Sequence, residues 1–190
     1  HVLLSGQPRW WSPREISATA GYTSMTASRL SAELVGRGLA ERSTGGRERF
    51  LRLAGDRRDV WARAQPFLRS PVLKEVDVCW DLVVTLLADA RQPAPRAGRD
   101  ALDADGSPAV VTTRALHIDA WRALAAQPAV APGCAQQVRL QIWAYPPAFT
   151  GVGAVIDPLS LYLSLQGKRG HDSDTLELRI EQALATAQHA

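Results

Sequence analysis

The spacing of apolar positions divides the start of the chain into short helices. Residues 2–5 match the last turn of one helix. The run Ser12-Pro13-Arg14-Glu15 predicts the start of a second, because Ser can cap a helix, Pro fits its first position and Glu completes a capping box. That helix is expected to stop at Gly21, and Thr23 is expected to cap a third helix over 24–36.

A hairpin and a further helix are predicted next. Residues 39–43 alternate between apolar and polar side chains, as a half-buried strand does. Residues 44–47 carry the turn signal Thr-Gly-Gly-Arg, and 50–53 return as the opposing strand. A helix then opens at Asp56 or Asp59 and directs Val60, Trp61 and Ala64 inward, and Trp10-Trp11 predicts a brief strand earlier in the chain.

The second half of the chain mixes strands with helices. Ser70-Pro71 marks a domain boundary, which gives a first domain of 1–69 and a second of 70–190. Because the strands and helices are not regularly alternated, the pattern favours an α+β fold with a separate, mixed α+β second domain. The predicted strands are 72–78, 109–112 and 138–143, and the predicted helices are 81–90, 118–126, 159–165 after an Asp157 cap, and 174–188.

The helix over 24–36 has a face available for a partner. At 100° per residue, Ala27, Leu30 and Leu34 form one inward stripe, while Met25 and Arg29 lie opposite. A helix with small outward residues and one Arg at its centre can enter the major groove of DNA. The predicted contacts near its N-terminus are Ser24, Thr26 and Ser28, in addition to Met25 and Arg29.

The distribution of charge changes how this face is interpreted. Residues 1–70 hold 12 arginines, no lysine and 6 acidic residues, a net charge of +6, whereas the whole chain carries only +3. Arg is the side chain best suited to bidentate contacts with phosphates and bases. Arg47 and Arg49 lie on the hairpin, where they can reach the DNA backbone or a narrow minor groove. We therefore expect duplex DNA as the partner of the first domain.

One segment resembles a known family. The residues Trp11-Ser12-Pro13-Arg14-Glu15-Ile16, Thr26-Ala27-Ser28-Arg29-Leu30 and above all Leu34-Val35-Gly36-Arg37-Gly38-Leu39-Ala40-Glu41-Arg42 resemble the winged helix-turn-helix of MarR-like bacterial transcription regulators. The resemblance covers about residues 1–65 and implies a DNA-binding transcription regulator with 23–36 as recognition helix and 39–53 as wing. The long flanking helices of full MarR-like proteins are not predicted.

The role of the second domain stays open. Its run Val155-Ile156-Asp157-Pro158-Leu159-Ser160-Leu161-Tyr162-Leu163-Ser164-Leu165 is similar to uncharacterised bacterial regulators and to AbiEi-type antitoxins. The alternatives are sensing of a small-molecule effector, formation of a homodimer, and binding of a protein partner in an antitoxin-like autoregulatory protein or adaptor. A third class, an enzyme with a fused winged helix, has no phosphate-binding glycine loop and no nucleophile paired with His117 or His171 to support it.

Composition adds expectations about cofactors and compartment. Cys79 and Cys134 are far apart and lack ligand-spaced partners, so we expect no metal, no cofactor and two reduced, buried thiols in the cytoplasm. No stretch approaches the ~18 apolar residues of a membrane span. The chain is therefore expected to have no membrane association and not to be an enzyme.

Overall fold

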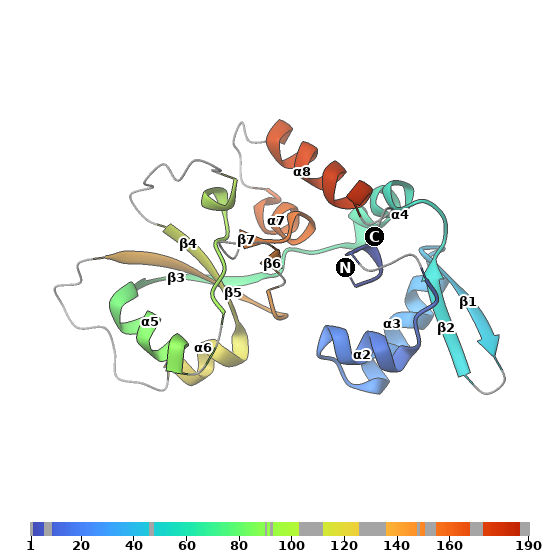
Figure 1. Ribbon diagram of the computed structural model, residues 1–190, viewed down its shortest axis with the longest axis horizontal. Coiled ribbons are helices and arrows are strands. Elements are labelled where there is room, and N and C mark those ends of the chain that lie inside the picture. The colour runs from blue at the N-terminus through green and yellow to red at the C-terminus, as the bar shows by residue number, and fades with distance from the viewer. Residues whose placement is uncertain are drawn as a thin grey trace. The chain divides into compact units, whose positions relative to one another are not determined.

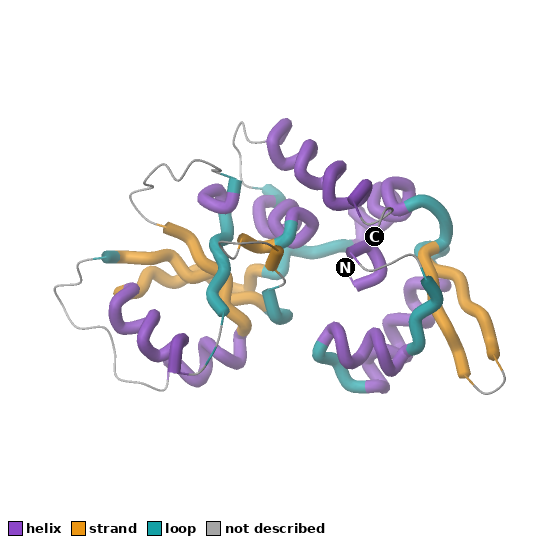
Figure 2. Tube along the Cα trace, viewed as in Figure 1, coloured by secondary structure: helices purple, strands orange, loops and turns teal. Residues whose placement is uncertain are grey.

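The computed structural model describes residues 2–5, 9–45, 48–89, 91, 93–102, 112–125, 136–147, 149–150, 155–167 and 173–186. The architecture is mixed α+β (Figures 1 and 2). The chain divides into two compact units, His1–Leu68 with Leu178–Ala190, and Arg69–Glu177. The division after Leu68 lies close to the predicted boundary, whereas residues 178–190, placed in the second domain by the sequence, fall in the first unit.

Three helices open the first unit. They are α1 (Val2–Ser5), α2 (Pro13–Ala20) and α3 (Ser24–Gly36). Ser12 caps α2 within a complete capping box, and Thr23 caps α3 by accepting a hydrogen bond from the backbone of Thr26. Gly21 ends α2 with a φ of 69°, the left-handed conformation that glycine adopts without steric cost.

A hairpin and a fourth helix follow. Strands β1 (Ala40–Gly45) and β2 (Glu48–Leu53) pair antiparallel, with Ala40 opposite Leu53. Helix α4 (Arg57–Ala64) begins after its cap Asp56, and the short helix η1 (Gln65–Phe67) continues from it. In place of the predicted Trp10-Trp11 strand, Trp11 alone bridges to Leu51 through two backbone hydrogen bonds of 2.7 and 2.8 Å.

The core of the first unit joins its helices to its hairpin. Leu3 of α1, Ile16 of α2, Ala40 of β1 and Leu51 of β2 are buried together. Trp11 and side chains from the end of α3 pack against them. As predicted, the inward side chains of α4 are also buried, namely Val60, Trp61 and Ala64. One face of the hairpin is therefore held against α2 and α3.

A three-stranded sheet organises the second unit. Its strands are β3 (Val72–Cys79), β4 (Thr112–His117) and β5 (Gln137–Trp143), in the order β3-β5-β4. β5 runs antiparallel to β3 and parallel to β4. The strand predicted at 109–112 ends too early, because β4 continues to His117; residues 109–111 lie outside the described residues.

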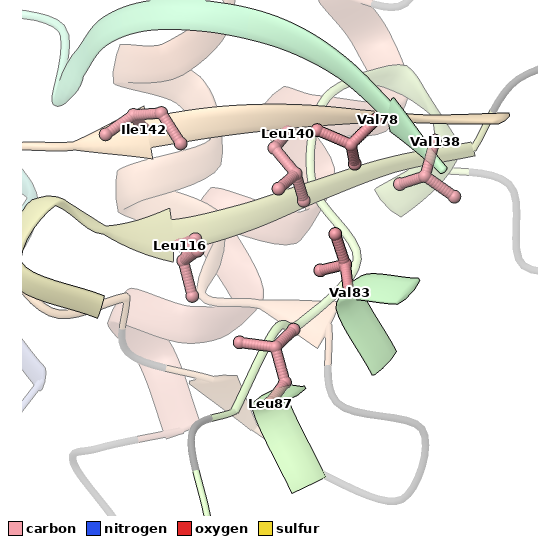
Figure 3. Close-up of a cluster of buried hydrophobic side chains, with 7 residues drawn as sticks. All are labelled: Val78, Val83, Leu87, Leu116, Val138, Leu140 and Ile142. Atoms are coloured by element: carbon pink, nitrogen blue, oxygen red, sulfur yellow. The ribbon is translucent and has the colours of Figure 1, made fainter. Parts of the chain in front are cut away.

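Alternate residues of this sheet build a core against two helices. Val138, Leu140 and Ile142 of β5 point to the side covered by α5 (Trp80–Asp89) and α6 (Ile118–Ala125). Figure 3 shows this cluster, which also holds Val78, Val83, Leu87 and Leu116. The predicted strand 138–143 is thus the central strand of the sheet, with every second side chain in the core.

The opposite face of the sheet is also covered. Gln141 and Trp143 of β5 are 1% and 0% exposed, and the indole of Trp143 donates a 3.3 Å hydrogen bond to the Gln141 amide oxygen. Helix α7 (Pro158–Leu165), capped by Asp157 as predicted, lies on the side away from α5 and α6 in Figure 1. The remaining elements are η2 (Arg99–Ala101), the pair β6 (Phe149–Thr150) and β7 (Val155–Ile156), and α8 (Ser173–Thr186).

The oxidation state of Cys79 differs from the prediction. The residue is buried, as predicted, but it is disulfide-bonded and is not a reduced thiol. The separation of the two cysteines in the sequence predicted free thiols, but the strand register places Cys79 opposite Gln137. The only other cysteine in the sequence, Cys134, stands three residues before Gln137, outside the described residues. Over the described part of the chain, no helix combines the length and the apolar character of a membrane span.

Candidate nucleic-acid interface

The N-terminal half of α3 presents an exposed face. The side chains predicted to contact DNA from this helix are all exposed, namely Ser24, Met25, Thr26, Ser28 and Arg29. Met25 is 70% exposed, more than any other large apolar side chain in the described part of the chain. The cap at Thr23 fixes where the helix begins, and so it fixes which residues occupy this first turn.

The buried face of α3 differs from the predicted stripe. Ala27 is fully buried as predicted, but Leu30 is 36% exposed and Ser31 is only 4% exposed. Ser31 tolerates burial because its hydroxyl donates a 2.7 Å hydrogen bond to the Ala27 carbonyl. The inward face is therefore rotated towards Ser31 and Val35, and Leu30 joins the border of the exposed face.

Thr26 takes part in the cap at the start of α3. Its backbone N–H donates to the hydroxyl of Thr23 at 3.3 Å, and the two hydroxyls lie 3.0 Å apart. A Thr26 hydroxyl that is shared with the cap can still accept or donate one further hydrogen bond. From the sequence, Thr26 was predicted only to contact DNA.

The two faces of the hairpin carry different arginines. The register places Arg42 opposite Leu51 and Thr44 opposite Arg49, so Arg42 and Arg49 share the face that packs on α2 and α3. Both are exposed. Among the described residues, Arg29, Arg42 and Arg49 make no ion pair or side-chain hydrogen bond. Their charges are therefore available to an anionic partner.

Other arginines of this unit serve the fold itself. Arg52, on the opposite face of the hairpin, pairs with Glu41 at 2.7 Å. Arg37 pairs with Glu33 at 2.7 Å and lies 4.1 Å from the centre of the Phe67 ring. Arg63 donates to the carbonyls of Gly38 and Ala54 at 2.8 and 2.7 Å. The sequence shows how many charged residues lie near one another in the chain, but not which groups they contact. These structural roles of the arginines were therefore missed.

The sequence also drew attention to one arginine of the hairpin and to two histidines. Arg47, predicted to contact DNA from the wing, lies outside the described residues, as does His171. His117 is partly buried, with its Nδ1 3.7 Å from an Asp119 carboxylate oxygen. Within the described ranges, no group of three or more His, Cys, Asp or Glu side chains is placed to hold a metal ion.

Comparison with known proteins adds no relative. No protein-family model matches this chain, and neither a curated protein nor a solved structure shows significant similarity to it. The geometry of the exposed helix and hairpin is therefore the basis for inferring a function.

Proposed function

We propose that this chain is a sequence-specific, duplex-DNA-binding transcription regulator. In this proposal α2, α3 and the β1–β2 hairpin form a winged helix-turn-helix of the MarR-like kind. Helix α3 enters the major groove and the hairpin contacts the backbone or the minor groove. The observation that carries the proposal is the placement of Arg42 and Arg49 on the hairpin face that packs on α2 and α3.

The exposed side chains of α3 fit base recognition. Arg29 can make a bidentate contact with guanine, and Met25 can meet the methyl group of thymine. Ser24 and Ser28 are small hydroxyl donors near the helix N-terminus, where backbone N–H groups and the helix dipole favour a phosphate. Arg42 and Arg49 supply phosphate contacts that carry no sequence information.

Selection from a random duplex library tests the proposal. The full chain should enrich a defined DNA sequence, and fluorescence anisotropy should show tighter binding to that sequence than to a scrambled duplex. We expect Arg29→Ala to cost about 1–3 kcal/mol on the selected sequence and to relax preference at one base-pair position.

Arg58→Ala is the matched control, because Arg58 is exposed and belongs to α4, which holds none of the proposed contacts. It should leave both affinity and preference unchanged. A library that yields no enriched sequence would contradict sequence-specific binding. Equal losses for Arg29→Ala and Arg58→Ala would contradict the placement of α3 in the groove.

A further inference from the structure

Met25 and Arg29 form one exposed stripe along α3. They stand four residues apart on the helix, so their side chains are neighbours on the same face, with Cβ atoms about 5–6 Å apart. Met25 is 70% exposed, and Arg29 is exposed as well. Ala27 and Ser31, at 0% and 4% exposed, are buried on the other side of the helix. The stripe therefore presents an apolar side chain and a cation to the same partner surface.

The charge of Arg29 is not used within the fold. Its acidic neighbour one turn further along the helix is Glu33, and Arg37 binds that carboxylate with two hydrogen bonds, of 3.0 Å from its Nε and 2.7 Å from its Nη2. Among the described residues, Arg29 itself makes no ion pair or side-chain hydrogen bond. Its guanidinium is therefore available for the bidentate contact with O6 and N7 of guanine, the commonest specific contact in the major groove.

The side chain of Met25 can recognise only one feature of a base edge. Its thioether donates no hydrogen bond and accepts one only weakly, so it does not read the amino and carbonyl groups by which the bases differ. It is flexible and polarisable, and it packs closely against small apolar groups. The 5-methyl group of thymine is the only methyl group that an unmodified base presents in the major groove. A cytosine methylated at C5 presents the same group at the same position.

The spacing of the two side chains restricts where the two base groups lie. Base pairs are stacked about 3.4 Å apart, so side chains that start about 5–6 Å apart reach base pairs that are adjacent or separated by one. The methyl group is therefore expected within about two base pairs of the guanine that Arg29 contacts.

Given the DNA-binding function proposed above, on which this inference rests, we propose that Met25 reads the 5-methyl group of a pyrimidine close to the guanine contacted by Arg29. Affinity then depends on the methyl group and not on which pyrimidine carries it. Thymine and 5-methylcytosine are both accepted at this position, whereas unmethylated cytosine is bound more weakly. Binding to a duplex with cytosine at this position therefore increases when that cytosine is methylated.

Two base exchanges that alter only the methyl group test this inference, with fluorescence anisotropy on the selected duplex and the full chain. Uracil in place of thymine removes the methyl group, and at one position it should weaken binding about fourfold, the effect of burying one methyl group. At the same position, 5-methylcytosine should bind about fourfold more tightly than cytosine. A third exchange, 7-deazaguanine for guanine, removes the N7 acceptor and identifies the guanine: it should weaken binding by the unaltered chain but not by Arg29→Ala.

A variant assigns the methyl effect to its side chain. Met25→Ala should bind the thymine duplex more weakly than the unaltered chain does, and it should lose both methyl effects. Leu178→Ala is the matched control, because Leu178 is another exposed apolar side chain, at 56%, and belongs to α8, which holds none of the proposed contacts. It should keep both methyl effects in full.

The inference is overturned if no pyrimidine near the identified guanine shows the methyl effect, if thymine shows it and 5-methylcytosine does not, or if Met25→Ala retains it. A chain that selects no duplex would contradict the proposed function itself. A chain that selects a duplex but does not respond to the methyl group contradicts this inference alone.

Discussion

A single carboxylate ties the entry of α2 together. Glu15 accepts hydrogen bonds from the Ser12 backbone N–H at 2.8 Å, from the Ser12 hydroxyl at 2.9 Å and from Arg9 at 2.7 Å. These interactions favour the ionised form and hold the pKa of Glu15 at about 2, against an ordinary value of 4.5. Because the folded pKa is the lower one, the stabilisation is present above about pH 4.5 and is lost as the pH falls towards 2.

Glu15→Gln should therefore destabilise the chain at pH 7 and have a smaller effect at pH 3. Gln keeps the size of the side chain but removes the charge that Arg9 and the cap favour. Urea unfolding midpoints at the two pH values measure the difference. Glu33→Gln is the control, since it removes one exposed charge paired with Arg37 four residues on. If both variants lose the same stability at both pH values, the cap of α2 does not favour ionised Glu15.

The hairpin shows how an element can separate two kinds of arginine. Arg49 and Arg52 are three residues apart on β2 but face opposite sides of the hairpin. We expect Arg49→Gln to weaken binding to every duplex by a similar factor and to reduce the salt dependence by about one unit of slope, because it removes one phosphate contact. Arg52→Gln should leave DNA affinity and slope unchanged. Anisotropy titrations over a range of salt concentrations distinguish the two.

The same assay can contradict the assignment of faces. If Arg52→Gln flattens the salt dependence and Arg49→Gln does not, the opposite face of the hairpin meets DNA. If neither variant changes affinity, the hairpin does not act as a wing.

Helix boundaries were largely predictable because caps are local. Ser12, Thr23, Asp56 and Asp157 each stand within three residues of the backbone groups that they cap, so the sequence contains the whole interaction. The end of β4 was predicted too early, because the length of this strand depends on pairing with β5, which lies far along the chain. The local alternation of apolar and polar side chains does not show that β5 is the pairing partner.

The same distinction between local and long-range interactions applies to the candidate site. The exposure of Met25 and Arg29 could be predicted from helical periodicity. The burial of Ser31 could not, because a hydroxyl that bonds its own helix looks polar in sequence. A pocket at the base of the hairpin was also missed, since three of its lining residues, Trp10, Arg52 and Arg57, lie far apart in the sequence.

For the molecule as a whole, the disulfide at Cys79 adds a constraint that composition did not predict. Thiol titration under denaturing conditions should find no free thiol without reductant and two after reduction, the number of cysteines in the sequence. Reduction should lower the stability of the chain by roughly 2–4 kcal/mol, because the unfolded state regains conformational freedom.

Cys79→Ser separates this effect from reductant chemistry. The variant should be less stable by a similar amount and should lose nothing more when reductant is added. Free thiols in the unreduced, unaltered chain would contradict the disulfide.

The charge of the whole molecule and the charge of the interface make different predictions for DNA binding. The chain carries only +3, but Arg29, Arg42 and Arg49 gather on one proposed surface, with Arg47 in the same hairpin segment of the sequence. Each phosphate contact contributes about 0.9 to the slope of log affinity against log salt concentration. We therefore expect the double variant Arg42→Gln, Arg49→Gln to flatten the slope by about two units on the selected duplex.

A charge change of the same size elsewhere is the decisive control. Asp81→Asn with Asp174→Asn alters two exposed residues of the second unit and raises the net charge from +3 by two. If local contacts set the affinity, this pair leaves the slope unchanged. If overall charge set it, the pair would strengthen binding to all duplexes, because long-range attraction depends on the total and is screened over about 10 Å at 0.1 M salt. A strengthened, sequence-independent affinity in this control would show that the arginines of α3 and the hairpin do not form a defined interface.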